Sequence, residues 1–193
     1  KATREQLLQG GAKAFGDHGY AGATARVIAV TSGVSVGTLY QYFEDRDHLL
    51  QQLAVSRAMG IGARVLALMR APADPDRDLA QQLAEQLRLV VEEVTEYHRQ
   101  DQALHAVLTE RRHADPEIDR ITTAAERHMV DEITGLLNRW GRQGDVQALA
   151  FILYHMVEGA VHAHVLGTPL ISDERFITSL VDTATRLAAP SKE

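Results

Sequence analysis

The stretch SGVSVGTLYQYF, residues 32–43, decides how the N-terminal part of the chain is expected to fold. Gly33 ends a short helix expected over residues 25–31, because glycine tolerates the left-handed conformation of a tight turn. Ser35 is a favourable N-cap for a second short helix that runs to about Tyr42. Two short helices joined by a glycine-containing turn form a helix-turn-helix, and the spacing predicts this motif here.

In a helix-turn-helix the second helix enters the major groove of DNA, so its exposed residues are expected to meet base edges. Gly37 would let the backbone approach the DNA closely, and Gln41 can pair with adenine. Val36 or the methyl group of Thr38 can contact a thymine methyl group. The complete set of expected DNA contacts is Thr24, Arg26, Ser35, Val36, Gly37, Thr38, Tyr40, Gln41, Tyr42 and Arg46.

Few of these contacts carry charge. Phosphates can be bound by hydroxyls, backbone amides and helix N-termini in addition to Lys and Arg. Arg46 is the one cation placed beside the expected helix N-termini. Binding is therefore expected to depend only weakly on salt. Two alternatives stay open: Tyr40 and Tyr42 could be core aromatics, and Arg26 could be only a solvated charge.

The rest of the chain also has helical periodicity, with Pro and Gly mostly where helices should stop and no strand-like alternation. We expect an all-α protein of about nine helices. A three-helix DNA-binding domain is expected over residues 1–46 and a helical effector-binding and dimerisation domain over residues 47–193, joined by a long helix that starts near Asp45.

Local signals set the expected helix ends. The first helix is expected over residues 3–16, closed by Gly16 and Gly19, and residues 71–76 read as a linker. The side chains expected to cap helices are Thr24, Ser35, Asp45, Asp115, Asp145 and Ser172.

Composition excludes several classes of protein. The 193 residues carry a net charge of −6 and contain no cysteine, which removes disulfides, thiolate metal sites and cysteine nucleophiles. The start, KATREQLLQG, lacks the apolar core of a signal peptide, and no uninterrupted apolar run approaches the ~18 residues that span a bilayer. We expect a cytoplasmic protein without a membrane partner. A first residue other than Met leaves room for an N-terminal extension in the natural protein.

The segment FGDHGYAGATARVIAVTSGVSVGTLYQYFEDRDHLL, residues 15–50, resembles the DNA-binding region of the TetR family of bacterial transcriptional regulators. The positions that match at fixed spacing are Phe15, Gly19, Tyr20, Thr24, Ile28, Ala29, Gly33, Val34, Ser35, Gly37, Thr38, Leu39, Tyr40, Phe43 and Leu49. The chain departs from the family at Ala23, where threonine is frequent, and at Arg46, where lysine is frequent. The resemblance is strong over residues 3–50 and lies only in the helix layout beyond them.

The resemblance implies a homodimeric repressor of a palindromic operator, released by a small molecule in the C-terminal domain. Ligand binding would shift the helix that starts near Asp45 and respace the two recognition helices. We expect a regulator rather than an enzyme, without a cofactor, because the sequence shows no nucleophile with an evident base and no phosphate loop. A regulator whose C-terminal domain only dimerises stays open as an alternative.

The helix expected over residues 145–166 carries most of the candidate sites in the C-terminal domain. A stripe of mostly small residues predicts a dimer interface, with tight packing inside one subunit as the alternative: Met156, Gly159, Ala160, Ala163 and Gly167. A pocket lined by Val, Leu, Met and Ile with a few polar groups would suit a mostly apolar effector. The candidate effector contacts are His105, Trp140, Tyr154 and Glu158.

A rival function uses the same helix. His155, Glu158 and His162 share a face at i, i+3 and i+7, and two imidazoles with a carboxylate could bind a zinc-like ion. This reading makes the chain a helical-bundle metal-binding protein or enzyme. A polar rim or interface hydrogen bonds are the simpler interpretation of these residues, and the sequence favours it, so no metal site is assigned.

Overall fold

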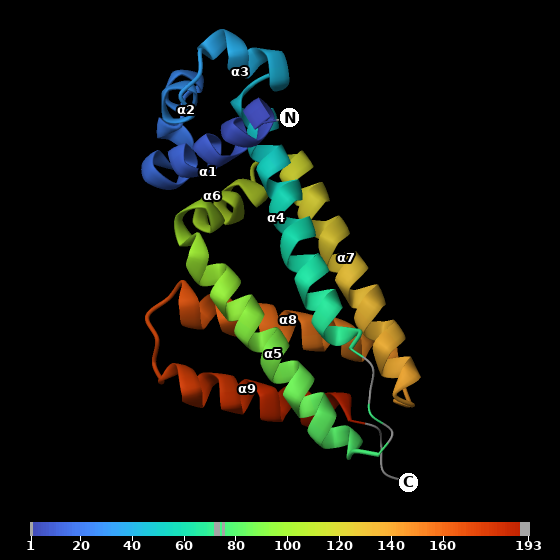
Figure 1. Ribbon diagram of the computed structural model, residues 1–193. Helices are drawn as coiled ribbons and strands as arrows, with labels where there is room; N and C mark the ends of the chain where they lie inside the picture. Colours follow the sequence, from blue (N-terminus) through green and yellow to red (C-terminus); the bar gives the residue numbers. More distant parts are fainter. Residues whose placement is uncertain (1, 72–73, 75, 190–193) are drawn as a thin grey trace. The chain divides into compact units, whose positions relative to one another are not determined.

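The computed structural model describes residues 2–71, 74 and 76–189, and these residues form nine α-helices and no strand (Figure 1). The expected all-α class is therefore confirmed. Packing divides the chain into two compact units. Unit 1 comprises Lys1–Met59 and Asp101–Ala124, and unit 2 comprises Gly60–Gln100 and Ala125–Glu193. The functional boundary expected between residues 46 and 47 stays a prediction, because units of packing need not coincide with units of function.

Unit 1 is built around the N-terminal helices. It contains α1 (Ala2–Gly22), α2 (Ala25–Thr31), α3 (Val36–Tyr42), α6 (Gln102–Arg112), the first part of α4 (Arg46–Met69) and the start of α7 (Pro116–Arg139). α1 packs against both α2 and α6. The largest side chains of this core that are at most 2% exposed are Leu7, Phe15, Ile28, Leu39, Phe43, Leu49, Leu50, Leu104 and Ile118. This core holds the helix-turn-helix against α1.

The expected end of the first helix was wrong. α1 continues through Gly16 and is interrupted at Gly19, whose φ of 66° lies in the left-handed region. A Cβ atom on Gly16 would lie 3.4 Å from the Cβ atom of Ala103, which belongs to α6. Gly16 therefore lies inside α1 where the helix faces α6, and Gly19 is the residue at which α1 is interrupted.

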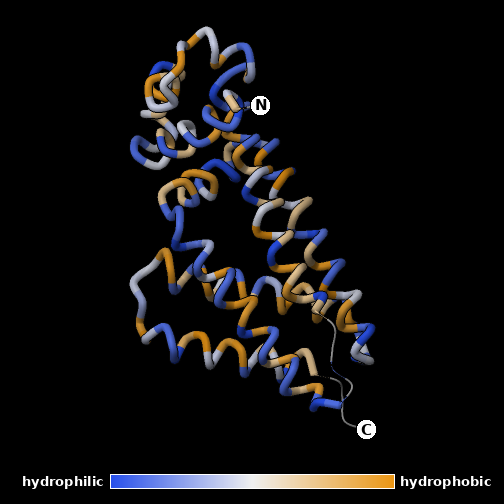
Figure 2. Tube along the Cα trace, in the orientation of Figure 1, coloured by the Kyte–Doolittle hydropathy of each residue, from blue (hydrophilic) through white to orange (hydrophobic). Residues whose placement is uncertain are grey.

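Unit 2 is a second helical bundle. It contains α5 (Leu79–Gln100), α8 (Val146–Val165), α9 (Asp173–Ala188) and the remaining parts of α4 and α7. α5 packs against α8 and α9, which also pack against each other. Figure 2 shows hydrophobic and hydrophilic residues alternating along α5 and α9, as expected of helices with one buried face. The buried residues at the centre of its two apolar clusters include Val65, Val91, Val94, Val161, Leu180, Leu83, Leu137, Ala150, Leu153 and Ala184.

Within the described residues, α8 is the one helix long and apolar enough to cross a membrane by length and composition. The sequence had led us to expect no such segment, because no uninterrupted apolar run approaches the ~18 residues that span a bilayer. Only 22% of the apolar window in α8 is buried inside the structure. The helix therefore leaves much apolar surface uncovered in a single chain.

Most of the expected helix caps are confirmed. The side chains that accept a hydrogen bond from a first-turn N–H group are Thr24, Ser35, Asp45, Asp115 and Asp145. Ser172 occupies the N-cap position of α9, but its side chain makes no capping hydrogen bond. The expected linker 71–76 includes residues 72, 73 and 75, which lie outside the described residues.

Candidate nucleic-acid interface and ligand pocket

The turn between α2 and α3 is fixed by short hydrogen bonds. Thr24 Oγ1 accepts the Val27 N–H group at 3.3 Å, and Ser35 Oγ accepts the Thr38 N–H group at 3.0 Å. Between the two helices Gly33 has a φ of 66°, a conformation that favours glycine. The expected bounds of α2 and α3 are confirmed, so the chain contains a helix-turn-helix.

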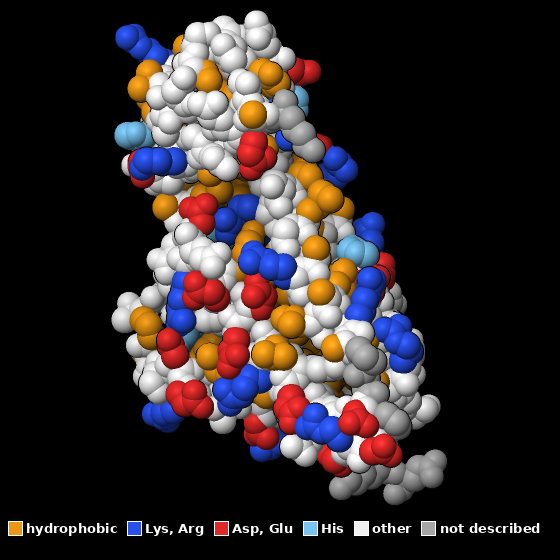
Figure 3. Space-filling view, viewed as in Figure 1, with side chains coloured by type: hydrophobic (Ala, Val, Ile, Leu, Met, Phe, Trp, Pro, Cys, Tyr) orange, Lys and Arg blue, Asp and Glu red, His pale blue; other side chains and the backbone are white. Residues whose placement is uncertain are grey.

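α3 presents one buried face and one exposed face. Leu39 and Phe43 are buried in the core of unit 1, whereas Tyr40 and Tyr42 are 54% and 40% exposed. Gln41 is exposed between them. The alternative that placed both tyrosines in the core is therefore wrong. In the view of Figure 3, the surface over α2 and α3 carries mainly uncharged side chains.

A pair of hydroxyl groups lies at the N-terminus of α3. Ser35 Oγ and Thr38 Oγ1 are 2.8 Å apart, and either of them can be the donor. The pair has two hydroxyl hydrogens and only one of them lies between the two oxygens, so the other is available to an outside acceptor. Phosphate oxygens are acceptors of this kind.

The two expected cations differ in their surroundings. Arg26 is exposed, as is Thr24 next to it. Arg46 is half-buried: its Nη1 donates to the Tyr20 carbonyl oxygen at 3.0 Å, and its Cζ atom lies 4.5 Å from the centre of the Tyr20 ring. The Arg46 guanidinium therefore binds the end of α1, and its contact with a phosphate stays a prediction.

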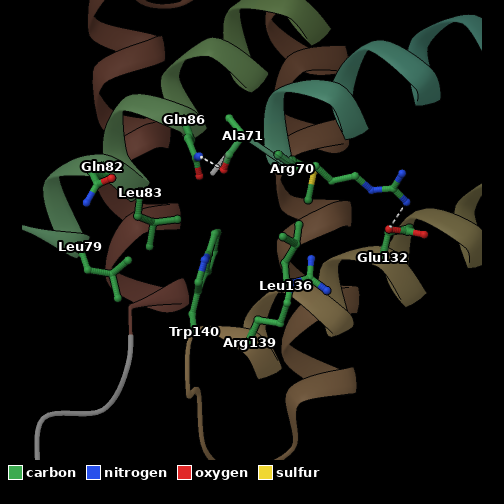
Figure 4. A pocket seen from close by; sticks show the side chains of 11 residues that line it. Arg70, Ala71, Leu79, Gln82, Leu83, Gln86, Glu132, Leu136, Arg139 and Trp140 are labelled. Atoms are coloured by element: carbon green, nitrogen blue, oxygen red, sulfur yellow. Dashed lines mark hydrogen bonds and ion pairs between the residues drawn. The ribbon is translucent and has the colours of Figure 1, made fainter. Parts of the chain in front are cut away.

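Unit 2 contains a pocket of about 580 Å³, formed by the end of α4, the first turns of α5 and the end of α7 (Figure 4). The Trp140 ring stands between Leu83 and Leu136 in this view. Arg70 pairs with Glu132 at 2.7 Å, and this hydrogen bond holds the pKa of the Glu132 carboxyl group below its ordinary value. The other residues that line the pocket are Met69, Ala71, Leu79, Gln82, Gln86 and Arg139.

The four expected effector contacts are not brought together in this pocket. Trp140 lines it, but His105 belongs to unit 1. Tyr154 packs against the apolar cluster around Leu153, and Glu158 lies beside two histidines on α5 and α8. Five of the eleven residues that line the pocket are polar or charged, which is more than the few polar groups expected from the sequence.

Three titratable side chains of unit 2 converge on one point. The Nε2 atoms of His98 and His162 are 3.0 Å apart. Glu158 Oε2 lies 3.5 Å from His98 Nε2 and 3.8 Å from His162 Nε2. Burial, with the neighbouring His98 imidazole, lowers the pKa of His162 below its ordinary value, and the Glu158 carboxylate acts in the opposite direction.

His155 does not belong to this cluster, although the sequence had grouped it with Glu158 and His162. Its ring is exposed and lies 4.3 Å from the Phe151 ring. A separation of i to i+7 corresponds to about 10.5 Å along a helix, so His155 and His162 lie two turns apart. The third member comes from another helix.

Comparison with known proteins identifies the chain. The family model described as bacterial regulatory proteins, tetR family, matches residues 7–53. A second model, the tetracyclin repressor-like C-terminal domain, matches residues 82–187, which is more than half of the chain. The chain belongs to the TetR family of bacterial regulatory proteins. The expected resemblance is therefore confirmed, and the helix-turn-helix is the DNA-binding motif of a TetR-family regulator.

Curated relatives match only this motif region. The transcriptional repressor AcnR of Corynebacterium diphtheriae is 39% identical over 51 residues, which cover 26% of this chain and 27% of AcnR. The transcriptional repressor Rv1474c of Mycobacterium tuberculosis is 38% identical over 53 residues, 28% of each chain. The match thus spans about a quarter of the length of these relatives.

Solved structures share the fold along nearly the whole chain. A TetR-family regulator from Mesorhizobium loti superimposes with a TM-score of 0.78 at 18% identity, over 96% of this chain and 95% of that one. The fatty acid degradation regulator FadR of Bacillus halodurans gives a TM-score of 0.72 at 18% identity, over 97% and 95%. At these identities the likeness concerns the fold alone.

Sequence reasoning missed two features of this TetR-family protein. Arg70 and Glu132 meet in the pocket although 62 residues separate them, and His98 meets His162 across 64 residues. The spacing along one helix carries no signal for such contacts. A histidine in the apolar stripe of α5 was the one available hint, since an unpaired polar group is costly to bury.

The residues expected to form a dimer interface are not all in the same environment: some pack inside the subunit and the others are exposed. Met156 and Ala160 pack against the apolar cluster around Val161, which supports the alternative of packing inside one subunit for these two residues. Gly159, Ala163 and Gly167 are exposed. The exposed side of α8 also carries larger apolar residues that had not been expected there, including Phe151 and Ile152.

Proposed function

We propose that this TetR-family protein is a cytoplasmic transcriptional repressor that binds a palindromic operator as a homodimer and is released by a small effector. The observation that carries the proposal is the exposed face of α3, where Tyr40, Gln41 and Tyr42 stand on a helix whose other side is buried. Such a face can contact DNA without disturbing the core. The curated relatives that share the motif are named repressors, which supports the direction of regulation.

The contacts divide into two groups. Val36, Gly37, Gln41 and the methyl group of Thr38 lie on α3, and we assign them to base edges. The phosphate contacts are assigned to the Thr38 hydroxyl group and to the remaining expected residues: Thr24, Arg26, Ser35, Tyr40, Tyr42 and Arg46. Because most of them are uncharged, few counterions are released on binding and the affinity should fall only gently with salt.

The exposed side of α8 supports dimerisation. Phe151 and Ile152 are 55% and 53% exposed, and Gly159 and Ala163 continue this surface along the helix. Large apolar side chains beside small ones allow a second α8 to pack closely across a two-fold axis. We assign this surface, which we call the α8 face, to the dimer interface.

The pocket in unit 2 is the candidate effector site. Trp140 and the surrounding leucines offer a surface for an apolar body, whereas Arg139 adds a guanidinium group to the lining that can donate to an acceptor. We propose an effector with an apolar ring or chain and at least one hydrogen-bond acceptor. Glu132 is already paired with Arg70 and would disfavour a second anion close to it.

The proposal is tested by selecting random-sequence duplex DNA on the full chain and sequencing what is retained. We expect one palindrome or a small set of related ones. Thr38→Ala and Tyr42→Phe should weaken binding to that sequence. Gln41→Ala should reduce the discrimination between the preferred base and the others at one position by about 1–3 kcal/mol. Thr183→Ala, on the exposed side of α9, is the matched control.

The two outcomes are distinct. Unchanged affinity in both the Thr38 and Tyr42 variants would remove the contact assignment while leaving the regulator intact. Recovery of no enriched sequence would remove the operator proposal itself.

A further inference from the structure

The proposed repressor function leaves the cluster of His98, Glu158 and His162 unused. Its three donor atoms come from α5 and α8, and all three residues belong to unit 2. The separations between them are 3.0, 3.5 and 3.8 Å. Around a tetrahedral zinc ion with bonds of about 2.0–2.1 Å, neighbouring ligand atoms lie about 3.3–3.4 Å apart. The cluster therefore approximates one face of such a tetrahedron.

The His98 ring is already oriented for a metal. Its Nδ1 atom lies 2.7 Å from the Val94 carbonyl oxygen, which can only accept, so Nδ1 carries the hydrogen and donates. The lone pair of Nε2 then points towards Glu158 and His162. Histidines that bind metals commonly donate their second ring N–H group to a backbone carbonyl, which fixes the tautomer and the ring.

Access and chemistry agree with this geometry. The His98 side chain is 4% exposed, whereas Glu158 and His162 are 28% and 36% exposed, so an ion can reach the cluster from one side. Two imidazoles with one carboxylate suit Zn²⁺ and its neighbours in the transition series, and they suit Mg²⁺ or Ca²⁺ poorly. Three donors leave the fourth corner of the tetrahedron to a further ligand.

We propose that His98, Glu158 and His162 bind one Zn²⁺-like divalent transition-metal ion per chain. The site is separate from the pocket around Trp140, and the inference does not depend on the operator or on the effector. The competing interpretation is a hydrogen-bonded network of two imidazoles and a carboxylate that binds no ion.

The test uses the full chain after treatment with a chelator. Zn²⁺ is titrated calorimetrically against a competing chelator, and Co²⁺ is added separately to record the visible absorption of tetrahedral cobalt. We expect one ion per chain, a raised unfolding temperature with Zn²⁺, and no competition from Mg²⁺. Zn²⁺ is the probe throughout, and circular dichroism establishes that each variant is folded.

His162→Gln and Glu158→Gln change part-exposed positions and should each weaken Zn²⁺ binding by at least about 100-fold, more than the loss of a supporting hydrogen bond causes. His155→Gln, an exposed histidine on the same helix, is the matched control and should bind Zn²⁺ as the unchanged chain does. Equal loss in His155→Gln and His162→Gln, or no Zn²⁺ bound by the unchanged chain, would overturn the site. Either result would leave the operator proposal untouched.

Discussion

Gly37 lies in the first turn of α3, where glycine is an unfavourable residue for a helix. A Cβ atom built at this position would meet only the Ser35 hydroxyl group, at an ordinary contact distance of 3.7 Å. The described part of the protein therefore has room for a side chain at Gly37. Packing within the chain does not require glycine at this position. The proposed close approach of DNA to the backbone does give a reason for it.

We expect Gly37→Ala to separate stability from function. The substitution should stabilise the folded chain by up to about 1 kcal/mol, because alanine has the higher helix propensity. It should at the same time weaken operator binding, since the new methyl group lies where DNA is proposed to approach. Denaturant unfolding and a DNA-binding titration measure the two effects.

Gly10→Ala provides the contrast at the same scale. A Cβ atom there would lie 2.1 Å from Ser32 Oγ and 2.6 Å from Ser32 Cα, so backbone must move and the chain should be destabilised. If Gly37→Ala binds the operator as tightly as the unchanged chain, DNA does not approach the backbone at this position.

At the scale of single elements, two serines at N-cap positions offer a matched pair. Ser35 Oγ accepts the Thr38 N–H group at 3.0 Å, whereas Ser172 makes no side-chain capping hydrogen bond. Ser35→Ala should therefore cost about 0.5–2 kcal/mol in the local stability of α3, and Ser172→Ala should cost less at α9. Amide hydrogen exchange of the two helices, measured by mass spectrometry, compares them directly. Equal loss of protection in both would contradict the capping assignment.

The α8 face gives a second prediction at this scale. Gly159→Arg adds a charge where a Cβ atom would meet no atom within 4 Å, so the single chain should fold unchanged. The proposed dimer should dissociate, because two arginines would meet near the two-fold axis. Sedimentation velocity measures the change from dimer to monomer.

Leu89→Asp is the control for the α8 face. Leu89 is an apolar residue of α5 that is 50% exposed and lies outside the α8 face, so its replacement should leave the dimer intact. A Gly159→Arg variant that still sediments as a dimer would place the interface elsewhere.

At the scale of the whole molecule, the sole tryptophan of the sequence lies in the candidate effector pocket. A small molecule that binds there should change the emission of Trp140 and weaken operator binding. Coupling between two sites in one protein is typically about 5–150-fold, and operator DNA must weaken ligand binding by the same factor. Fluorescence titrations with and without operator DNA measure both directions.

Arg139→Gln should weaken the binding of the same ligand if the acceptor group of the ligand contacts the Arg139 guanidinium. A ligand that changes Trp140 emission and leaves operator affinity unchanged would show that the pocket is not the effector site. The alternative of a regulator whose C-terminal domain only dimerises, and binds no effector, would then be favoured.

The sequence predicted the parts of this molecule that depend on local signals. Helices α2 and α3, their caps and the layout of nine helices over the described residues follow from periodicity and from residues that satisfy first-turn N–H groups. Glycine was ambiguous, because Gly16 and Gly19 look alike in sequence although α1 continues through the first and is interrupted at the second.

The sites of unit 2 were less predictable for a physical reason. The i, i+3 and i+7 pattern placed His155 with Glu158 and His162, but donor atoms around one ion must converge within a few ångströms. His98 meets that condition from another helix, and the pairing depends on tertiary packing. The same holds for Arg70 and Glu132 in the pocket.

The hydroxyl pair at the start of α3 has a consequence for how operators can vary. Ser35 and Thr38 share one hydrogen between two oxygens 2.8 Å apart, and a bond rotation reverses which of them points its own hydrogen outward. The pair is thus a donor with two positions, and changing between them moves no heavy atom. A phosphate displaced by a fraction of the distance between these oxygens would still find a donor. Binding sites whose sugar-phosphate backbones follow slightly different paths should therefore be tolerated at this point, while discrimination between sequences depends on the base contacts of α3.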